Sequence, residues 1–192
     1  ITLLVETEID GEPLDRRHLL GTCFLLLLAG IDTTWSAIGS SLWHLATHPE
    51  DQARLRAEPD LIDSAVEELL RVYSPVTMAR EVIADVDVAG CPMKPGDKVL
   101  MSFPAANRDP AQFENPDEFI IDRERNRHVA FGSGIHRCLG SNLARMELRV
   151  AIQEWLTRIP TFELADPAAV TWTGGQVRGP RTIPVRWSAT QP

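Results

Sequence analysis

One cysteine of this chain lies in a setting that favours chemistry at sulfur. Cys138 follows a glycine-rich turn that contains Gly132, Gly134 and His136, and a strongly helical run begins beside it. The two glycines permit positive φ and a close approach of the backbone. At the start of a helix, unpaired N–H groups and the helix dipole favour an anion and lower the pKa of a thiol. These residues predict a thiolate that acts as a nucleophile, a redox thiol or a metal ligand.

The neighbouring residues help to choose among these alternatives. A cysteine nucleophile needs a histidine base, but a turn would point His136 elsewhere and no orienting partner is evident. The run Gly132-Ser133-Gly134 could belong to a dinucleotide loop, but no βαβ unit surrounds it. A single thiolate suits haem better, because the porphyrin itself supplies the other ligands in its plane. A cysteine that is merely buried at a helix start is the alternative without chemistry.

The composition is typical of a soluble globular domain and excludes several classes of function. With 192 residues, of which 44% are hydrophobic, the chain can bury a substantial core. Its net charge of −8 argues against a nucleic-acid partner, which needs a basic surface. Its three cysteines form neither a disulfide framework nor a zinc motif, which favours a reducing, cytoplasmic setting. The most apolar stretch, residues 19–31, is shorter than the roughly 18 residues of a membrane helix, so we expect no membrane association.

The elements that must position the cysteine are mostly helical. Asp15 is a candidate cap for a helix of roughly thirty residues that ends near Thr47. Its middle is apolar on nearly all sides, so we expect it to run through the core. Pro49 is at the favoured first position of a second helix, and a third helix is expected over about residues 60–72.

After Pro75 the pattern changes to short strands and loops. Residues 86–101 alternate between apolar and polar and predict short strands, and a long irregular segment follows from about 104 to 128. A helix is expected from about 138 to 159, and residues 173–187 are typical of loop and strand. Two apolar stripes predict that both faces of the 138–159 helix are packed; they comprise Leu139, Leu143, Met146 and Val150, and Leu148, Ile152, Trp155 and Ile159.

Five residues around the cysteine match a spacing of known meaning, F-x-x-G-x-[HR]-x-C-x-G; they are Phe131, Gly134, His136, Cys138 and Gly140. The segment resembles the haem-binding signature of the cytochrome P-450 monooxygenases. The resemblance implies that Cys138 ligates the iron of haem b (iron protoporphyrin IX). It also implies that Phe131 shields the sulfur and that His136 hydrogen-bonds a haem propionate. The fold class implied is mainly α with small β-sheets: the C-terminal half of the cytochrome P-450 fold, with a long central distal helix, a cysteine loop and a proximal helix.

The motif "AGIDTT", residues 29–34, is similar to the oxygen-binding groove of the same family. A hydroxyl such as that of Thr33 can bond back to a helix carbonyl and open the helix locally. The resemblance implies that dioxygen is held there and that Asp32 and Thr33 deliver protons as catalytic residues. In isolation the pair would more often be solvated, but an unpaired aspartate in a buried helix would be costly.

The motif "EELLR" places Glu68 and Arg71 on one helix face. Most such pairs lie on the surface and contribute little to stability. The resemblance implies a buried pair that locks the irregular segment, with Arg123 as its third member. Its role would be structural, since it positions the cysteine loop.

The motif "VTMAR", residues 76–80, supplies a further haem contact. Arg80 resembles the propionate-binding arginine of the family, and a guanidinium suits a carboxylate bidentately. By the same resemblance, the substrate pocket is expected to be lined by Leu28, Ala29, Val76, Thr77, Gly175 and Gln176.

The resemblance spans about residues 3–187 and implies an activity. Residues 1–192 would form the C-terminal portion of a single haem-binding monooxygenase domain, with the N-terminal half absent. Such a soluble, bacterial-type enzyme inserts one oxygen atom from O2 into a small apolar organic substrate. Its electrons come from a ferredoxin, a reductase or a fused reductase domain; residues 25–49 are similar to the self-sufficient subgroup in which the reductase is fused. Arg137, Arg145 and Arg149 could receive an acidic redox partner, although solvated charges are the simpler interpretation.

Two alternative functions stay open. One is a haem-binding sensor or carrier without monooxygenation, against which Asp32 and Thr33 argue because a sensor needs no proton relay. The other is an inactive fragment that does not retain haem.

Overall fold

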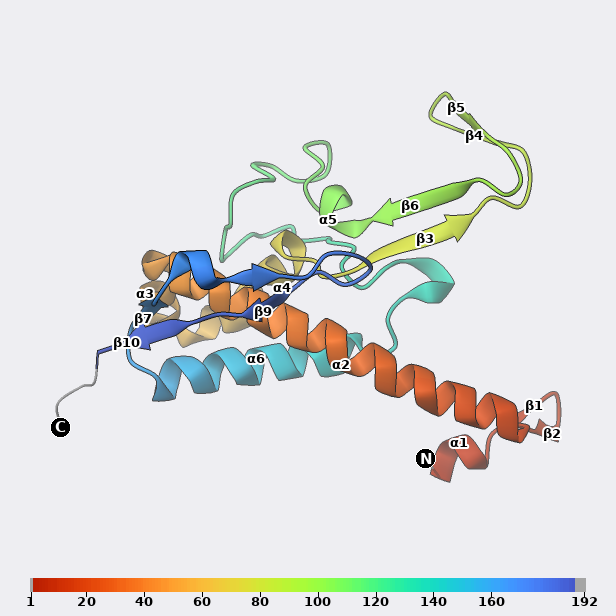
Figure 1. Ribbon diagram of the computed structural model, residues 1–192, viewed down its shortest axis with the longest axis horizontal. Helices are drawn as coiled ribbons and strands as arrows, with labels where there is room; N and C mark the ends of the chain where they lie inside the picture. The colour runs from red at the N-terminus through yellow and green to blue at the C-terminus, as the bar shows by residue number, and fades with distance from the viewer. Residues whose placement is uncertain (1, 189–192) are drawn as a thin grey trace.

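The computed structural model describes residues 2–188, and helices form its framework (Figure 1). The helices are α1 (Thr2–Val5), α2 (Arg16–Thr47), α3 (Pro49–Ala57), α4 (Ile62–Val72), α5 (Phe103–Ala106) and α6 (Ser141–Arg158), with the 3-10 turns η1 (Pro59–Leu61), η2 (Gly134–His136) and η3 (Pro167–Ala169). The strands are β1 (Glu8–Ile9), β2 (Glu12–Pro13), β3 (Thr77–Glu81), β4 (Val86–Val88), β5 (Cys91–Met93), β6 (Lys98–Ser102), β7 (Phe162–Leu164), β8 (Thr171–Trp172), β9 (Pro180–Thr182) and β10 (Val185–Trp187). They pair antiparallel as β1–β2, β3–β6, β4–β5, β7–β10 and β8–β9. The predicted class, mainly α with small sheets, is confirmed.

The predicted helix boundaries at the start of the chain are confirmed by their caps. The Asp15 carboxylate accepts the His18 N–H at 2.9 Å, and α2 then continues for 32 residues to Thr47. Pro49 occupies the first turn of α3, where its missing N–H is not needed. The expected third helix is observed as η1 followed by α4.

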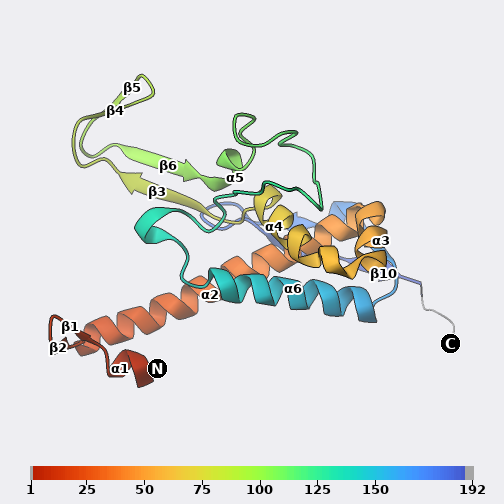
Figure 2. The same cartoon turned by 180° about the vertical axis from the view of Figure 1, so that it is seen from behind.

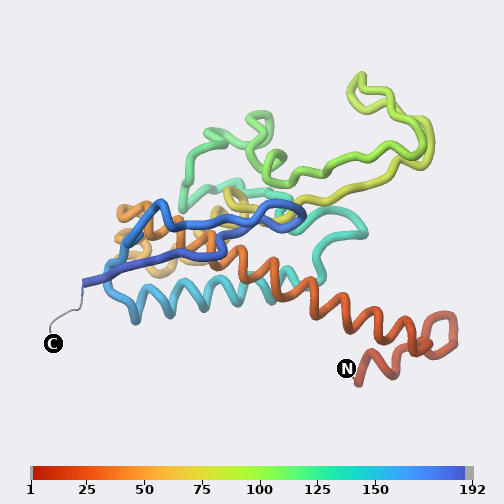
Figure 3. The backbone as a smooth tube through the Cα atoms, viewed as in Figure 1, coloured from red at the N-terminus to blue at the C-terminus, as the bar shows by residue number. Residues whose placement is uncertain are grey.

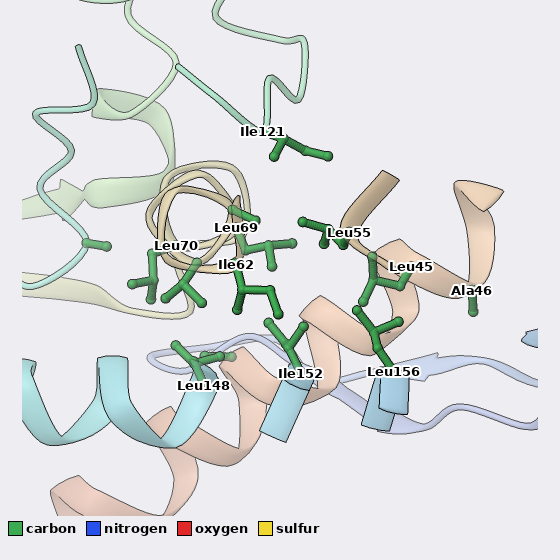
Figure 4. Packing of buried hydrophobic residues seen from close by; sticks show 14 of the residues in the cluster. Leu45, Ala46, Leu55, Ile62, Leu69, Leu70, Ile121, Leu148, Ile152 and Leu156 are labelled. Carbon is green, nitrogen blue, oxygen red and sulfur yellow. The ribbon is translucent and has the colours of Figure 1, made fainter. Parts of the chain in front are cut away.

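The core lies where the C-terminal third of α2 meets α3, α4 and α6. Figure 4 shows its aliphatic side chains converging from these helices and from the irregular segment. The labelled members are Leu45, Ala46, Leu55, Ile62, Leu69, Leu70, Ile121, Leu148, Ile152 and Leu156. Because α4 and α6 pack directly against each other (Figure 2), the residues that they carry are held in a fixed relation.

The N-terminal half of α2 is exposed, so the prediction that its apolar middle runs through the core is wrong for this chain. The side chains of Leu20, Phe24, Leu25, Leu26, Leu27, Leu28 and Ile31 are 52–66% exposed. The buried residues of α2 begin at Ser36, and Figure 1 shows the earlier turns extending away from α3, α4 and α6. By length and composition alone α2 could cross a membrane, since one 18-residue window has a mean hydropathy of 1.5. The same helix continues into the packed core at its other end.

Helix α6 is packed on one face only. Leu148 and Ile152 are fully buried against α2 and α4, whereas Leu143 and Met146 are about half exposed. The other members of the exposed stripe are Leu139 and Val150. The prediction that both faces are packed is therefore wrong, because α2 and α4 lie on the same side of α6. The helix also begins at Ser141 rather than at Cys138.

The irregular segment and the C-terminal hairpin complete the framework. The backbone tube of residues 107–133 leaves α5 and returns past α4 toward the cysteine (Figure 3). The β8–β9 hairpin packs on α2, where Gly179 is buried against Ser36. "VTMAR" supplies β3, which pairs with β6 in a register that sets Thr77 opposite Ser102. The expected strands after residue 86 and in the tail are observed.

Candidate functional site

A loop of residues 131–140, here called the cysteine loop, presents the Cys138 thiol to solvent. Gly132 and Gly134 have φ of 71° and 64°, so both take the left-handed conformation that glycine favours. The Cys138 N–H donates to the Phe131 carbonyl at 2.8 Å and closes the loop. Cys138 is a free, exposed cysteine that lies just before α6, whose N-cap is Gly140. It was expected in the first turn of that helix, and it precedes the helix instead.

The cysteine loop carries two uncovered apolar side chains near the cysteine. Ile135, three residues before Cys138, and Leu139, directly after it, are 98% and 88% exposed. A Cβ on Gly140 would lie 3.9 Å from the Cys138 sulfur, an ordinary contact. His136 is exposed in η2. A soft sulfur donor framed by uncovered apolar side chains fits iron in a flat apolar macrocycle better than it fits a hydrated cation.

The Asp32–Thr33 pair lies on α2 at the boundary between its exposed and packed parts. The Thr33 hydroxyl donates to the Ala29 carbonyl at 2.7 Å, as the sequence predicts. The expected local opening of the helix is wrong, because α2 continues unbroken through this point. The Asp32 side chain is 41% exposed, and its carboxylate lies 3.7 Å from the Arg181 guanidinium of β9. The expectation of a buried, unpaired aspartate is therefore wrong, because α2 has left the core at this point.

Glu68, Arg71 and Arg123 meet in one buried network. Arg71 donates two hydrogen bonds to the Glu68 carboxylate, both at 2.8 Å, and Arg123 donates to it at 3.0 Å. The remaining Arg71 donors bind the carbonyls of Asn107, Pro116 and Glu118. Burial opposes ionisation of Glu68, but the hydrogen bonds from Arg71 and the backbone outweigh it and lower the pKa of Glu68. The network ties α4 to the irregular segment that leads to the cysteine loop.

Glu67 forms a second network that sequence reasoning missed. Its carboxylate accepts hydrogen bonds from Arg145 at 2.6 and 2.9 Å and lies 3.0 Å from the His128 ring nitrogen Nε2. The Arg145 guanidinium also lies over the Phe131 ring, 4.5 Å from its centroid. The interpretation of Arg145 as a solvated charge is thus wrong. The one signal in the sequence was the acidic doublet of "EELLR", which gives α4 two carboxylates that point about 100° apart.

The other two arginines of the predicted partner surface differ in their contacts. Arg149 lies 3.9 Å from the exposed Asp63 carboxylate, and Arg137 is exposed in the cysteine loop. An acidic redox partner at this surface stays a prediction.

Four of the predicted pocket residues come together at one junction. The Thr77 N–H donates to the Gln176 carbonyl at 2.9 Å, and its hydroxyl donates to the Gly175 carbonyl at 3.2 Å. Val76 forms an isolated bridge with Val177. Leu28 and Ala29 lie elsewhere, on the exposed part of α2.

Arg80 lies on β3, three residues after Thr77, and pairs with Val99 across the sheet. Its guanidinium donates to the Ala79 carbonyl at 2.9 Å. Since a guanidinium carries five donors, this contact leaves others free to bind a carboxylate.

This arrangement defines a class: a mainly helical protein in which the loop between a long irregular segment and a packed helix presents an exposed cysteine. The family model for cytochrome P-450 matches residues 1–167, and the chain belongs to the cytochrome P-450 family. Haem is the cofactor of that family.

Bacterial members of the family are similar over nearly the whole chain. Cytochrome P-450 105C1 of a Streptomyces species is 47% identical over 184 residues, which are 93% of this chain and 48% of that protein. The vitamin D3 dihydroxylase of Streptomyces griseolus is 40% identical, over 96% of this chain and 46% of that protein. The solved structure of the polyketide synthase cytochrome P-450 PksS of Bacillus subtilis superposes with a TM-score of 0.92 at 42% identity, over 97% of this chain and 49% of that one. The chain thus spans about half the length of the curated relatives it matches.

Proposed function

We propose that residues 1–192 form the C-terminal portion of a single haem-binding domain that acts as a cytoplasmic haem-thiolate monooxygenase. The observation that carries the proposal is the exposed Cys138 thiol at the end of a loop shaped by two left-handed glycines. Haem-thiolate ligation needs this combination, because the sulfur must reach an iron that approaches from outside the backbone.

Different residues of this chain would bind different parts of the cofactor. Cys138 would ligate the iron, while Arg80 and His136 would donate to the propionates. Phe131 would pack behind the sulfur, and Gly134 and Gly140 would leave room at the loop backbone. When bound, the haem supplies the binding and reductive activation of O2.

Asp32 and Thr33 would manage protons from their place on α2. The Asp32 carboxylate is partly exposed, so it can exchange a proton with water. The Thr33 hydroxyl can accept a proton at oxygen while it donates its own, since one hydroxyl is both donor and acceptor. Its bond to the Ala29 carbonyl holds that oxygen in place on α2.

The substrate we propose is a small apolar organic molecule. Leu28 and Ala29 on α2 and the junction of Val76, Thr77, Gly175 and Gln176 would line its pocket. Relatives carry the names of a vitamin D3 dihydroxylase and of a polyketide biosynthesis enzyme, and a solved relative from Bacillus megaterium is in complex with testosterone. O2 and an electron donor, either a ferredoxin with its reductase or a fused reductase domain, would be the other partners. Nucleic acid and membrane are not among the partners we propose.

Haem loading tests the proposal directly. The chain is reconstituted with hemin, reduced and exposed to CO, and the red-shifted Soret band of a thiolate-ligated ferrous complex is recorded. We expect the band in the wild-type chain and its loss in Cys138→Ser. Cys91→Ser, which changes another exposed cysteine, is the matched control and should keep the band. No band in the wild-type chain, or its survival in Cys138→Ser, would contradict the proposal.

A further inference from the structure

Glu67 contacts the chain on both sides of the cysteine loop. Before the loop, the His128 Nε2 lies 3.0 Å from the Glu67 carboxylate, and the other ring nitrogen of His128 accepts the Ala130 N–H at 3.2 Å. These two contacts fix the ring, since Nδ1 accepts and Nε2 must therefore carry a proton that it donates to Glu67. After the loop, Arg145 of α6 donates its bidentate pair of hydrogen bonds to the same carboxylate.

Arg145 carries this connection into the loop itself. Its guanidinium is held edge-on by Glu67 and lies with its face over Phe131, which leaves the cation little freedom to rotate. Phe131 in turn accepts the Cys138 N–H on its carbonyl. From Glu67 to the backbone of the cysteine, therefore, each step is a direct contact: carboxylate to guanidinium, guanidinium to ring, and carbonyl to amide.

The burial and charge of the cluster suit such a role. His128 is almost fully buried, and Glu67 and Arg145 are each 30% exposed, so the pair is shielded from solvent far more than an ordinary surface pair. Burial opposes ionisation of Glu67, but the hydrogen bonds from His128 and Arg145 lower the pKa of Glu67 to about 2. The carboxylate is therefore ionised at neutral pH and balances the Arg145 charge, to which two hydrogen bonds join it.

We propose that Glu67 is a positioning residue for the thiolate: by holding His128 and Arg145 together it fixes the two ends of the cysteine loop and, through Phe131, the Cys138 backbone. Glu68 next to it has a different task, since it binds Arg71 and Arg123 on another side of α4. The part of this proposal that concerns thiolate ligation of haem rests on the proposed function. The part that concerns the geometry of the cysteine loop does not, because that geometry is present in the chain without haem.

The first experiment uses the haem-free chain, so that its failure is separate from failure of haem binding. Amide hydrogen exchange is measured at Cys138 in the loop and at Ile152 in the core of α6. In Glu67→Gln we expect exchange at Cys138 to accelerate about tenfold, as for loss of one charged hydrogen-bond group, with Ile152 unchanged. The matched control is Glu154→Gln, which removes an exposed α6 ion pair with Arg158 and should leave both amides unchanged.

A second readout distinguishes positioning from simple support of the fold. In hemin-loaded chains, only part of the ferrous CO complex of Glu67→Gln should show the thiolate band. We expect this fraction to be at least about threefold lower than in the wild-type chain, because the loop conformation that ligates the iron is less populated. Glu67→Asp keeps the charge on a shorter stem and should restore part of that fraction. If Glu67→Gln fails to fold, Arg145→Lys takes its place, because lysine keeps the charge but lacks the planar fork. Amide exchange that accelerates equally at Cys138 and Ile152 would overturn the proposal. Unchanged exchange at Cys138, in Glu67→Gln or in the Arg145→Lys variant that replaces it, would do the same.

Discussion

Arg71 and Glu68 form a doubly hydrogen-bonded ion pair in which neither side chain has any exposed surface. Two charges removed from water in this way are stable only while every donor and acceptor is matched. Here the match is extensive, because Arg71 also binds three carbonyls of the irregular segment and Glu68 also accepts the Ile120 N–H. The pair therefore joins α4 to a segment that has little regular structure of its own.

We expect Glu68→Gln to lower the free energy of unfolding by about 3 to 5 kcal/mol, because it leaves the buried Arg71 charge without its partner. Urea unfolding followed by circular dichroism measures the loss. Arg158→Gln is the matched control: it removes the exposed pair with Glu154 and should cost less than about 1 kcal/mol. Similar losses in the two variants would show that the buried network does not stabilise the fold.

Gly179→Ala should weaken the packing of the C-terminal hairpin on α2. A methyl group at this position would overlap the Ser36 side chain and lie 2.8 Å from the Ser36 Cα, so the hairpin must move. We expect a loss of about 1 to 3 kcal/mol in the same urea titration, in the range of overpacked cores. Gly174→Ala places a methyl group in open space of the same hairpin and should be nearly neutral. Equal effects would mean that the close approach is not required.

The acid stability of the chain should depend on Glu67. Its pKa is about 2 in the folded chain against an ordinary 4.5, so the unfolded state takes up the proton first as the pH falls. The stability that Glu67 contributes is complete above about pH 4.5 and is lost as the pH falls toward about 2. Unfolding free energies of wild type and Glu67→Gln, compared across this range, should converge at low pH. A difference that stays constant with pH would be inconsistent with a lowered pKa.

The proposed proton route predicts a specific loss in Thr33→Ala. The variant lacks the hydroxyl that binds the Ala29 carbonyl, so the haem-loaded enzyme should consume more O2 for each molecule of product. O2 uptake and product formation are measured together. Thr34→Ala, one residue along the same helix, is the control and should keep the wild-type ratio. An unchanged ratio in Thr33→Ala would remove that hydroxyl from the route.

Local signals predicted the elements well. Asp15 and Pro49 fix helix starts through contacts within one turn, so their positions can be inferred from neighbouring residues alone. The burial of the long helix could not be inferred in this way. An apolar sequence indicates that a helix needs cover, but whether the covering residues belong to the same chain is not a local property. The same reason explains why only one stripe of α6 is packed.

The candidate site shows the same difference between features that neighbouring residues fix and features that long-range packing fixes. The spacing around Cys138 is contained within ten residues, which is why a motif could find it. Glu67 and Arg145 are 78 residues apart in sequence and meet only because α4 packs on α6. Arg181 reaches Asp32 from a C-terminal strand for a similar reason. A long-range ion pair leaves no periodic trace in the sequence.

The uncovered leucines of α2 also bear on how the purified chain behaves in dilute buffer. A contiguous exposed apolar surface of this kind favours association with a second copy of the chain. Particle size measured by light scattering should therefore grow with concentration, even though the net charge of −8 keeps the molecules apart at long range. Mild detergent micelles would shield this surface, and spectra should be recorded in their presence so that turbidity is not mistaken for absorbance.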